Sequence, residues 1–112
     1  MWERSHQLVL DIYKISLAFP KAEIYGLTNQ IRRSAISIPA NIAEGCGRDS
    51  QAELLRFFKI AMGSASELEY EILLARDLNW MDETIYSNIS VELISIRKML
   101  NAFIQKIKKD MV

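Results

Sequence analysis

The chain has little cysteine, little histidine and no long apolar run, and each shortage excludes a class of protein. The single cysteine, Cys46, cannot form an internal disulfide, which fits a reducing compartment. The single histidine, His6, has no nucleophile or carboxylate at the spacing of a catalytic or metal site. No stretch approaches the ~18 consecutive apolar residues of a membrane span, and the N-terminus does not resemble a signal peptide. We therefore expect a cytoplasmic, non-enzymatic protein with no metal, cofactor, membrane contact or small-molecule substrate.

Net charge is also absent, because 14 basic residues balance 14 acidic ones, but the two signs are sorted along the chain. Residues 1–48 hold six basic and four acidic side chains, residues 49–96 three and nine, and residues 97–112 five and one. Such sorting suits a basic surface for polyanions, or acidic and basic faces that meet between helices or subunits. Solvated faces with no partner are the alternative interpretation.

Length and composition indicate one folded domain over residues 1–112. A chain of 12.9 kDa is expected to expose roughly 6,300 Å² of surface when folded, against about 18,700 Å² unfolded. Half of the residues are apolar and a quarter are charged, which is ordinary for a globular protein. A core can therefore form without disulfides or metals.

Apolar residues recur at helical spacing in four segments. We expect helices from about Trp2 to Phe19, across Gly26 to Arg48, from Ser50 to about Ala75, and from Asp82 to about Lys108. The third segment carries a seven-residue apolar repeat, formed by Leu54, Phe58, Ala61, Ala65, Leu68, Ile72 and Ala75. Four long helices with short links predict an all-α fold, namely an antiparallel up-down four-helix bundle.

The second segment contains a structural motif around Pro39, which stands inside an otherwise regular helical pattern. Proline removes one backbone donor and costs about 3 kcal/mol in an ordinary helix, so packing must compensate for it. Ser37, Asn41 and Glu44 are polar residues at helical spacing that could satisfy the loosened backbone or one another. Gly45, with Gly47, is expected to end the helix in the left-handed conformation.

The third segment holds four small residues in a row, Gly63 to Ser66. We expect them to let the proline-containing helix approach closely. Outside the apolar repeat, this segment has more apolar residues than one buried stripe can use: Leu55, Phe57, Ile60, Met62, Leu73 and Leu74. The surplus indicates burial on a second side, which in so short a chain favours contact with another subunit.

Two groups of basic residues are candidates for contact with nucleic acid. The first consists of Arg32, Arg33 and Arg48, and the second of Lys106, Lys108 and Lys109 in the last turns of the final helix. Each group also has a structural interpretation: Arg33 could pair with Glu44 or with acids of the third helix, and the lysines complement the helix dipole. The sequence leaves both interpretations open.

Three stretches resemble a known family closely: QIRRSA at 30–35, SIPANIAEG at 37–45 and AMGSASELE at 61–69. The Tyr25-Gly26-Leu27 segment and the Arg-Asp-Leu-Asn-Trp turn at 76–80 extend the resemblance over the whole chain. On these residues the chain is identified as a member of the "four helix bundle protein" family, which includes proteins encoded in intervening sequences of bacterial large-subunit ribosomal RNA genes.

The resemblance implies a left-handed bundle that assembles as a homopentamer. It also implies kinship with the accessory proteins of diversity-generating retroelements, which are pentameric and bind nucleic acid. We therefore expect a homo-oligomeric bundle that binds RNA or DNA, preferably structured RNA, through its basic patches. The alternative is a protein–protein interaction scaffold that binds no nucleic acid.

Overall fold

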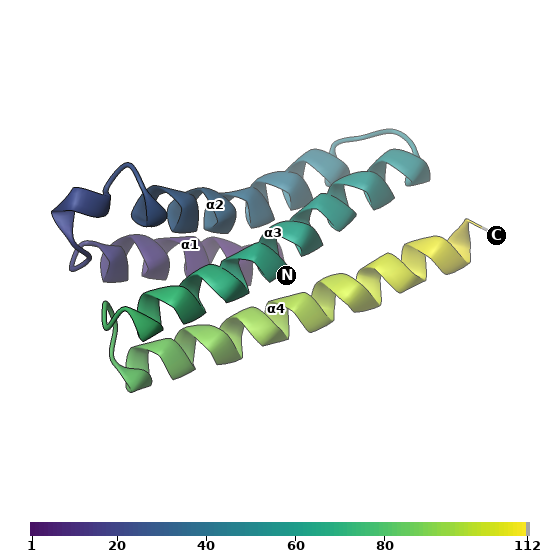
Figure 1. The fold of residues 1–112 in the computed structure, drawn as a ribbon. Helices are drawn as coiled ribbons and strands as arrows, with labels where there is room; N and C mark the ends of the chain where they lie inside the picture. The colour runs from purple at the N-terminus through teal and green to yellow at the C-terminus, as the bar shows by residue number, and fades with distance from the viewer. Residues whose placement is uncertain (112) are drawn as a thin grey trace.

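Four helices run alternately in opposite directions along the molecule. The computed structural model describes residues 1–111, and within them it contains α1 (Trp2–Ser16), α2 (Leu27–Cys46), α3 (Gln51–Asp77) and α4 (Glu83–Asp110). A short 3-10 helix, η1 (Lys21–Glu23), lies between α1 and α2. Successive helices are antiparallel and the described residues form no strand, which confirms the predicted up-down bundle (Figure 1). None of these helices is both long enough and apolar enough to cross a membrane.

The ends of α3 and α4 follow from local side-chain chemistry. The Ser50 hydroxyl accepts a hydrogen bond from the Glu53 amide at 3.1 Å, and the Asp82 carboxylate accepts one from the Ile85 amide at 2.8 Å. Each bond satisfies an amide that the first turn leaves without a helical partner. At the end of α3, Asn79 adopts φ 63°, and its amide donates to the Arg76 carbonyl while the Trp80 amide donates to the Ala75 carbonyl. This is a Schellman cap, which closes the helix at the predicted turn.

One predicted helix end was wrong in position, and another was right in position but wrong in conformation: α2 ends at Cys46 with Gly47 as its C-cap, as expected, but without a left-handed glycine. The helix α1 ends at Ser16 and not at Phe19, yet Phe19 remains buried and packs its ring 5.3 Å from that of Trp80. At the C-terminal end of α2, Gly47 has φ −88°, and no glycine among the described residues has a positive φ. Gly45 lies inside the last turn of α2, where its missing side chain gives room to α3.

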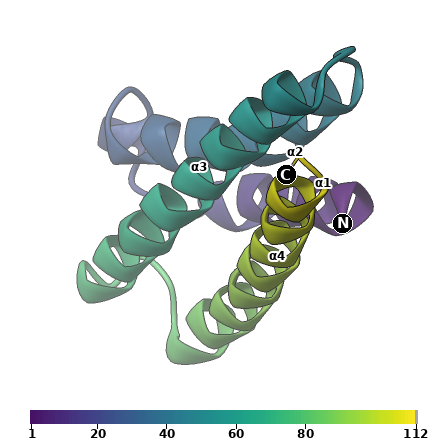
Figure 2. The same ribbon diagram turned by 90° about the vertical axis from the view of Figure 1, so that its right-hand side faces the viewer.

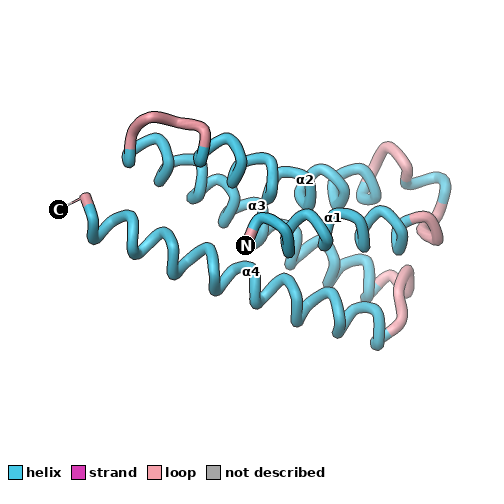
Figure 3. The backbone as a smooth tube through the Cα atoms, turned by 180° about the vertical axis from the view of Figure 1, so that it is seen from behind, coloured by secondary structure: helices cyan, strands magenta, loops and turns pink. Residues whose placement is uncertain are grey.

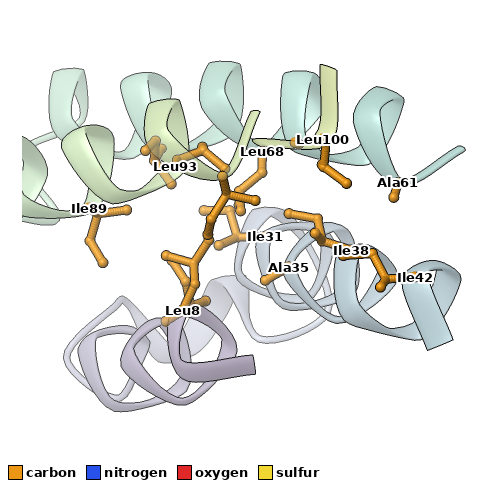
Figure 4. Close-up of a cluster of buried hydrophobic side chains, with 14 of the residues drawn as sticks. Leu8, Ile31, Ala35, Ile38, Ile42, Ala61, Leu68, Ile89, Leu93 and Leu100 are labelled. Atoms are coloured by element: carbon orange, nitrogen blue, oxygen red, sulfur yellow. The ribbon is translucent and has the colours of Figure 1, made fainter. Parts of the chain in front are cut away.

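The core is a continuous apolar cluster to which all four helices contribute (Figure 4). The α3 repeat is buried as predicted except for Leu54, which is partly exposed. The apolar side of α2 is buried as well, with Ile31, Ala35 and Ile38 fully inside, while Leu27 at its start is partly exposed. The exposed surface of 6683 Å² lies close to the value expected for a well-packed chain of this size.

The helix α1 is much shorter than α3 and α4, so the bundle is unequal at its two ends. The α2–α3 turn and the last turns of α4 extend beyond the N-terminus of α1 (Figures 1 and 3). There the core continues through α3 and α4, for example where the rings of Phe58 and Phe103 stack at 4.8 Å. Where α1 lies beside α4, the Arg4 guanidinium donates two hydrogen bonds to the Glu92 carboxylate, at 2.8 and 3.0 Å, and joins the two helices.

Candidate nucleic-acid interface

Basic side chains gather at the end of the bundle that α1 does not reach. This end consists of the α2–α3 turn, the first turns of α3 and the last turns of α4, and it faces the viewer in Figure 2. We define the basic end by six exposed residues: Arg48, Arg56, Lys59, Lys106, Lys108 and Lys109. Four of these six are residues that the sequence indicated, and the fold brings them to one end because α2 and α4 both finish there.

Arg48 and Arg56 are both held against one aromatic ring. Their guanidinium carbons lie 5.0 and 4.4 Å from the centroid of the Phe57 ring. Arg56 also pairs with Glu53 at 2.8 Å, and this hydrogen bond, together with the charge of Arg48, lowers the pKa of the Glu53 carboxyl. Exposed ion pairs of this kind contribute about 0–1 kcal/mol. The Phe57 ring therefore fixes the orientation of both guanidinium groups. Because their ion pairs contribute little free energy, replacing a carboxylate partner by a phosphate would cost little free energy.

Glu44 differs from its predicted place in the motif around Pro39. Its carboxylate forms an ion pair with Arg48 one turn later and does not contact Arg33. The three lysines in the last turns of α4, Lys106, Lys108 and Lys109, by contrast, have no acidic side chain within ion-pair distance in residues 1–111. Their charges are therefore the least compensated part of the basic end.

Arg32 and Arg33 lie apart from the basic end, toward the start of α2, and their surroundings differ. The Arg32 Nε donates to the Ser16 hydroxyl at 2.9 Å, and its guanidinium lies 4.8 Å over the ring of Tyr13, so Arg32 joins α2 to α1. Arg33 is exposed and forms no ion pair with the described residues. Arg33 therefore forms neither of the ion pairs that the sequence suggested, with Glu44 or with the acids of α3.

Pro39 is buried within α2, and the helix continues through it. Close by, the Asn41 side-chain amide donates to the Ser37 carbonyl at 2.7 Å and to the Ser37 hydroxyl at 2.9 Å. The Ser37 hydroxyl also shares a hydrogen bond of 2.7 Å with the Ser64 hydroxyl of α3. This network supplies the predicted polar support beside the proline, and it also links α2 to α3.

The glycine that permits close approach of α2 and α3 is Gly45. Of the four small residues predicted to do so, Ser64 contacts α2 and Ala65 is buried, whereas the prediction was wrong for Gly63. A Cβ atom at Gly45 would lie 3.0 Å from the Cβ atom of Phe57 and 3.2 Å from the ring of Phe58. At Gly63 a Cβ atom would meet nothing within 4 Å, because this residue faces outward. Ala61 and Ala65, one turn apart on the buried side, supply the small contacts within the bundle.

A polar groove between α2 and α3 is the main feature that sequence reasoning missed. It has a volume of about 410 Å³ and is lined by Gln30, Arg33, Ser34, Ser37, Ser64 and Glu67. Glu71, one turn after Glu67, is only 4% exposed, and its Oε1 atom has no hydrogen-bond partner among the described residues. Burial raises the pKa of the Glu71 carboxyl to about 7, against the smaller lowering effect of the Ser34 hydroxyl. The neighbouring Glu67 carboxylate raises this pKa further.

The sequence alone does not distinguish Glu71 from an exposed glutamate, because only its place in the bundle buries it. Glu71 stands between Leu68 and Ile72 of the apolar repeat, on the side of α3 that turns toward α2. Elsewhere, no group of three or more His, Cys, Asp or Glu side chains is arranged to hold a metal ion in the part of the chain that the structure describes.

Comparison with known proteins shows a family and a close likeness to a solved structure. Residues 1–102 match the model of a family described as 23S rRNA-intervening sequence protein. Among solved structures, the chain is similar to a protein of unknown function from the S23 ribosomal protein family of Bacteroides thetaiotaomicron VPI-5482. The two chains are 26% identical and superpose with a TM-score of 0.85 over 93% of this chain and 94% of the other. No curated protein matches the sequence.

Proposed function

Because this chain belongs to the family of 23S rRNA-intervening sequence proteins, we propose that it is a non-enzymatic bundle that binds structured RNA through its basic end. The observation that carries the proposal is the meeting of two basic segments, Arg48 to Lys59 and Lys106 to Lys109, at one end of the molecule. Phosphate groups bind lysine and arginine by releasing counterions, so such clustering favours a polyanion.

The two arginines of the basic end also have a hydrogen-bonding geometry that suits phosphate. The two guanidinium groups on the Phe57 ring are planar donors that can bind phosphate oxygens in a bidentate manner. Structured RNA is recognised largely through its shape and its phosphates, which such donors fit. Duplex DNA would bind the same positive charges, so the binding assay must compare structured RNA with duplex DNA.

We propose further that copies of the chain associate through the outward face of α3 and α4, with the pentamer as the expected state. Several apolar side chains of α3 and α4 are exposed, including Ile60, Tyr70, Val91 and Ile94. Met62 and Ile94 line a shallow hollow of about 400 Å³ between the two helices. Burial of apolar surface contributes about 25 cal/mol per Å², so a face of this kind stabilises an oligomer. Five copies would also combine weak RNA contacts into avidity.

The RNA proposal is tested by binding assays with a labelled RNA hairpin, and with a DNA duplex of equal length, at increasing salt. We expect the affinity to fall by about 10³-fold between 50 and 200 mM salt if about six phosphates are neutralised, because each contact releases counterions. The double variant Lys108→Gln/Lys109→Gln should weaken binding and reduce the salt slope. The matched control Lys14→Gln/Lys21→Gln removes two charges away from the basic end and should bind like the parent protein.

The second candidate function is a protein-binding scaffold, which the exposed apolar face favours. Light scattering with absorbance at 260 and 280 nm on the same peak separates the two. A mass of five chains with excess absorbance at 260 nm would support assembly and nucleic-acid binding together. A pentamer that binds no RNA at 50 mM salt would refute the RNA proposal and favour the scaffold, whereas a monomer would refute the assembly.

A further inference from the structure

A row of exposed side chains runs along the outer side of α1. We call it the α1 row, and it consists of four residues at helical spacing: Glu3, Leu10, Lys14 and Leu17. Leu10 and Leu17 are 49% and 79% exposed, and neither belongs to the core cluster. Burying these two leucines therefore requires a surface that the rest of the chain does not supply.

A second row of the same kind lies on the outer side of α4. This α4 row consists of five exposed residues, also at helical spacing: Glu83, Ser87, Val91, Ile94 and Lys98. Val91 and Ile94 are 65% and 44% exposed, and neither belongs to the core cluster. Ile94 and Lys98 also line the hollow between α3 and α4, so the α4 row is part of the face through which copies are proposed to associate.

The acid of the α1 row lies level with the base of the α4 row. The helices α1 and α4 lie side by side and run in opposite directions (Figure 3). Arg4, next to Glu3, reaches with its Nη1 atom to 3.8 Å from the Sδ atom of Met99, which is next to Lys98. Glu3 and Lys98 therefore stand at about the same height along the bundle.

The other two charges match in the same way. Lys14 shares a hollow with Ile85, which follows Glu83 by two residues. The two charges are about 16 Å apart along the α1 row and about 22 Å apart along the α4 row, and long side chains can span the difference. Glu3, Lys14 and Lys98 form no ion pair within the described residues. At both heights, an acid on one row thus stands level with a base on the other.

We infer that the α4 row of one copy packs against the α1 row of a second copy, in a head-to-tail contact that rests on the proposed association. When two copies stand side by side in the same orientation, the acid of each row faces the base of the other. The leucines of the α1 row then meet Val91 and Ile94. Because the two rows are different surfaces, each contact leaves one row of each kind free, and addition continues until the rotation closes a ring.

Self-pairing of one row is the competing arrangement. Each row has an acid and a base, so it also complements a second copy of itself in the antiparallel direction. Such an isologous contact closes as a dimer and leaves the other row uncovered. The head-to-tail contact covers both apolar rows at once, which favours it in a molecule that exposes both.

The first experiment compares the masses of the parent chain, Leu10→Glu and Val91→Glu by light scattering. Both positions are exposed, so both variants should fold, which circular dichroism checks. We expect each variant alone to be a monomer, and the equimolar mixture to form a one-to-one pair through the single combination of intact rows. A dimer of either variant alone would overturn the inference in favour of self-pairing. If Leu10→Glu assembles like the parent and Val91→Glu does not, the inference fails while the proposed association stands.

The second experiment reverses charges in the intact assembly. Lys98→Glu places a second acid opposite Glu3, and the concentration for half assembly should rise at least about fivefold, because like charges that face each other repel. Adding Glu3→Lys to the same chain should restore it, since only the head-to-tail contact brings these two positions together between copies. Lys21→Glu, outside both rows, is the control and should change nothing.

The charge test uses reversals because neutral replacements are too mild. An exposed ion pair contributes about 0–1 kcal/mol, so replacing one of these residues by glutamine should leave assembly unchanged. Failure of Glu3→Lys to rescue Lys98→Glu would overturn the inference, even if the copies associate. A parent chain that stays monomeric would refute the proposed association together with this inference, whereas RNA binding by that monomer would leave the RNA proposal standing.

Discussion

Replacing Glu71 with glutamine is expected to stabilise the bundle at alkaline pH and to change it little at acid pH. Glu71 is buried, and its pKa of about 7 in the folded chain exceeds the ordinary value of 4.5 that applies after unfolding. The folded state therefore holds the Glu71 proton more tightly than the unfolded state. The contribution of Glu71 to stability must fall as the pH rises from about 4.5 to about 7 and level off above that, because ionisation then opposes burial.

The size of the effect follows from the difference between the two pKa values. One pKa unit corresponds to about 1.36 kcal/mol, so the ionised Glu71 costs about 3 kcal/mol at about pH 8 and less than about 1 kcal/mol at about pH 5. Glutamine resembles the neutral acid in shape and does not titrate. Glu71→Gln should therefore raise the free energy of unfolding at pH 8 by about 3 kcal/mol, a large part of the stability of a domain of this size.

Urea unfolding of both proteins at four pH values from about 5 to about 8, followed by circular dichroism, measures this difference. Other titrating groups cancel when the variant is subtracted from the parent at each pH. Glu3→Gln, at an exposed position, is the control and should leave the parent's pH dependence unchanged. A difference between Glu71→Gln and the parent that stays constant over this range would refute the assignment of a raised pKa to Glu71.

Three further predictions concern stability and are measured by urea unfolding. Gly45→Ala should cost about 1–3 kcal/mol, because its Cβ atom would lie 3.0 Å from that of Phe57, whereas Gly63→Ala should stabilise the monomer by about 0.5–1 kcal/mol; equal effects would contradict the packing described. Asn79→Ala should cost about 1 kcal/mol and Asn79→Gly should not, since φ 63° at this position disfavours a Cβ atom, and similar losses in both would refute this reason. A double-mutant cycle on Arg4 and Glu92 should give a coupling free energy below about 1 kcal/mol that decreases as salt is added, because the pair is exposed. A coupling of several kcal/mol would contradict this expectation for an exposed ion pair.

The fold could be predicted from the sequence because its signals are periodic and local. The seven-residue repeat from Phe58 to Ala75 fixes the buried side of α3, and Ser50, Asn79 and Asp82 cap helices through contacts within a few residues. Where a helix end depends on tertiary packing, the prediction failed. Phe19 continues the apolar period of α1, but it is buried after the helix has already ended.

The candidate sites were harder to predict, because they depend on which elements meet in space. Nothing local distinguishes Arg32, which is bound to α1, from Arg33, which is free at the groove. Arg48 and the lysines Lys106, Lys108 and Lys109 come to one end because of the antiparallel topology and the helix lengths, whereas the sequence analysis had placed them in two separate groups. The burial of Glu71 was not predicted, because a glutamate beside an apolar repeat is normally exposed.

The short connection between α2 and α3 has a consequence for the order in which the chain folds. The helices α2 and α3 are joined by only residues 47–50 and share the most extensive pairing in the bundle, so closing this hairpin costs little chain entropy. The Arg4–Glu92 contact, in contrast, joins residues 88 apart and forms one of the few links between α1 and α4. Pulsed hydrogen exchange during refolding should therefore protect the amides of α2 and α3 first. The N-terminal helix, although it is synthesised first, would become fixed against α4 last.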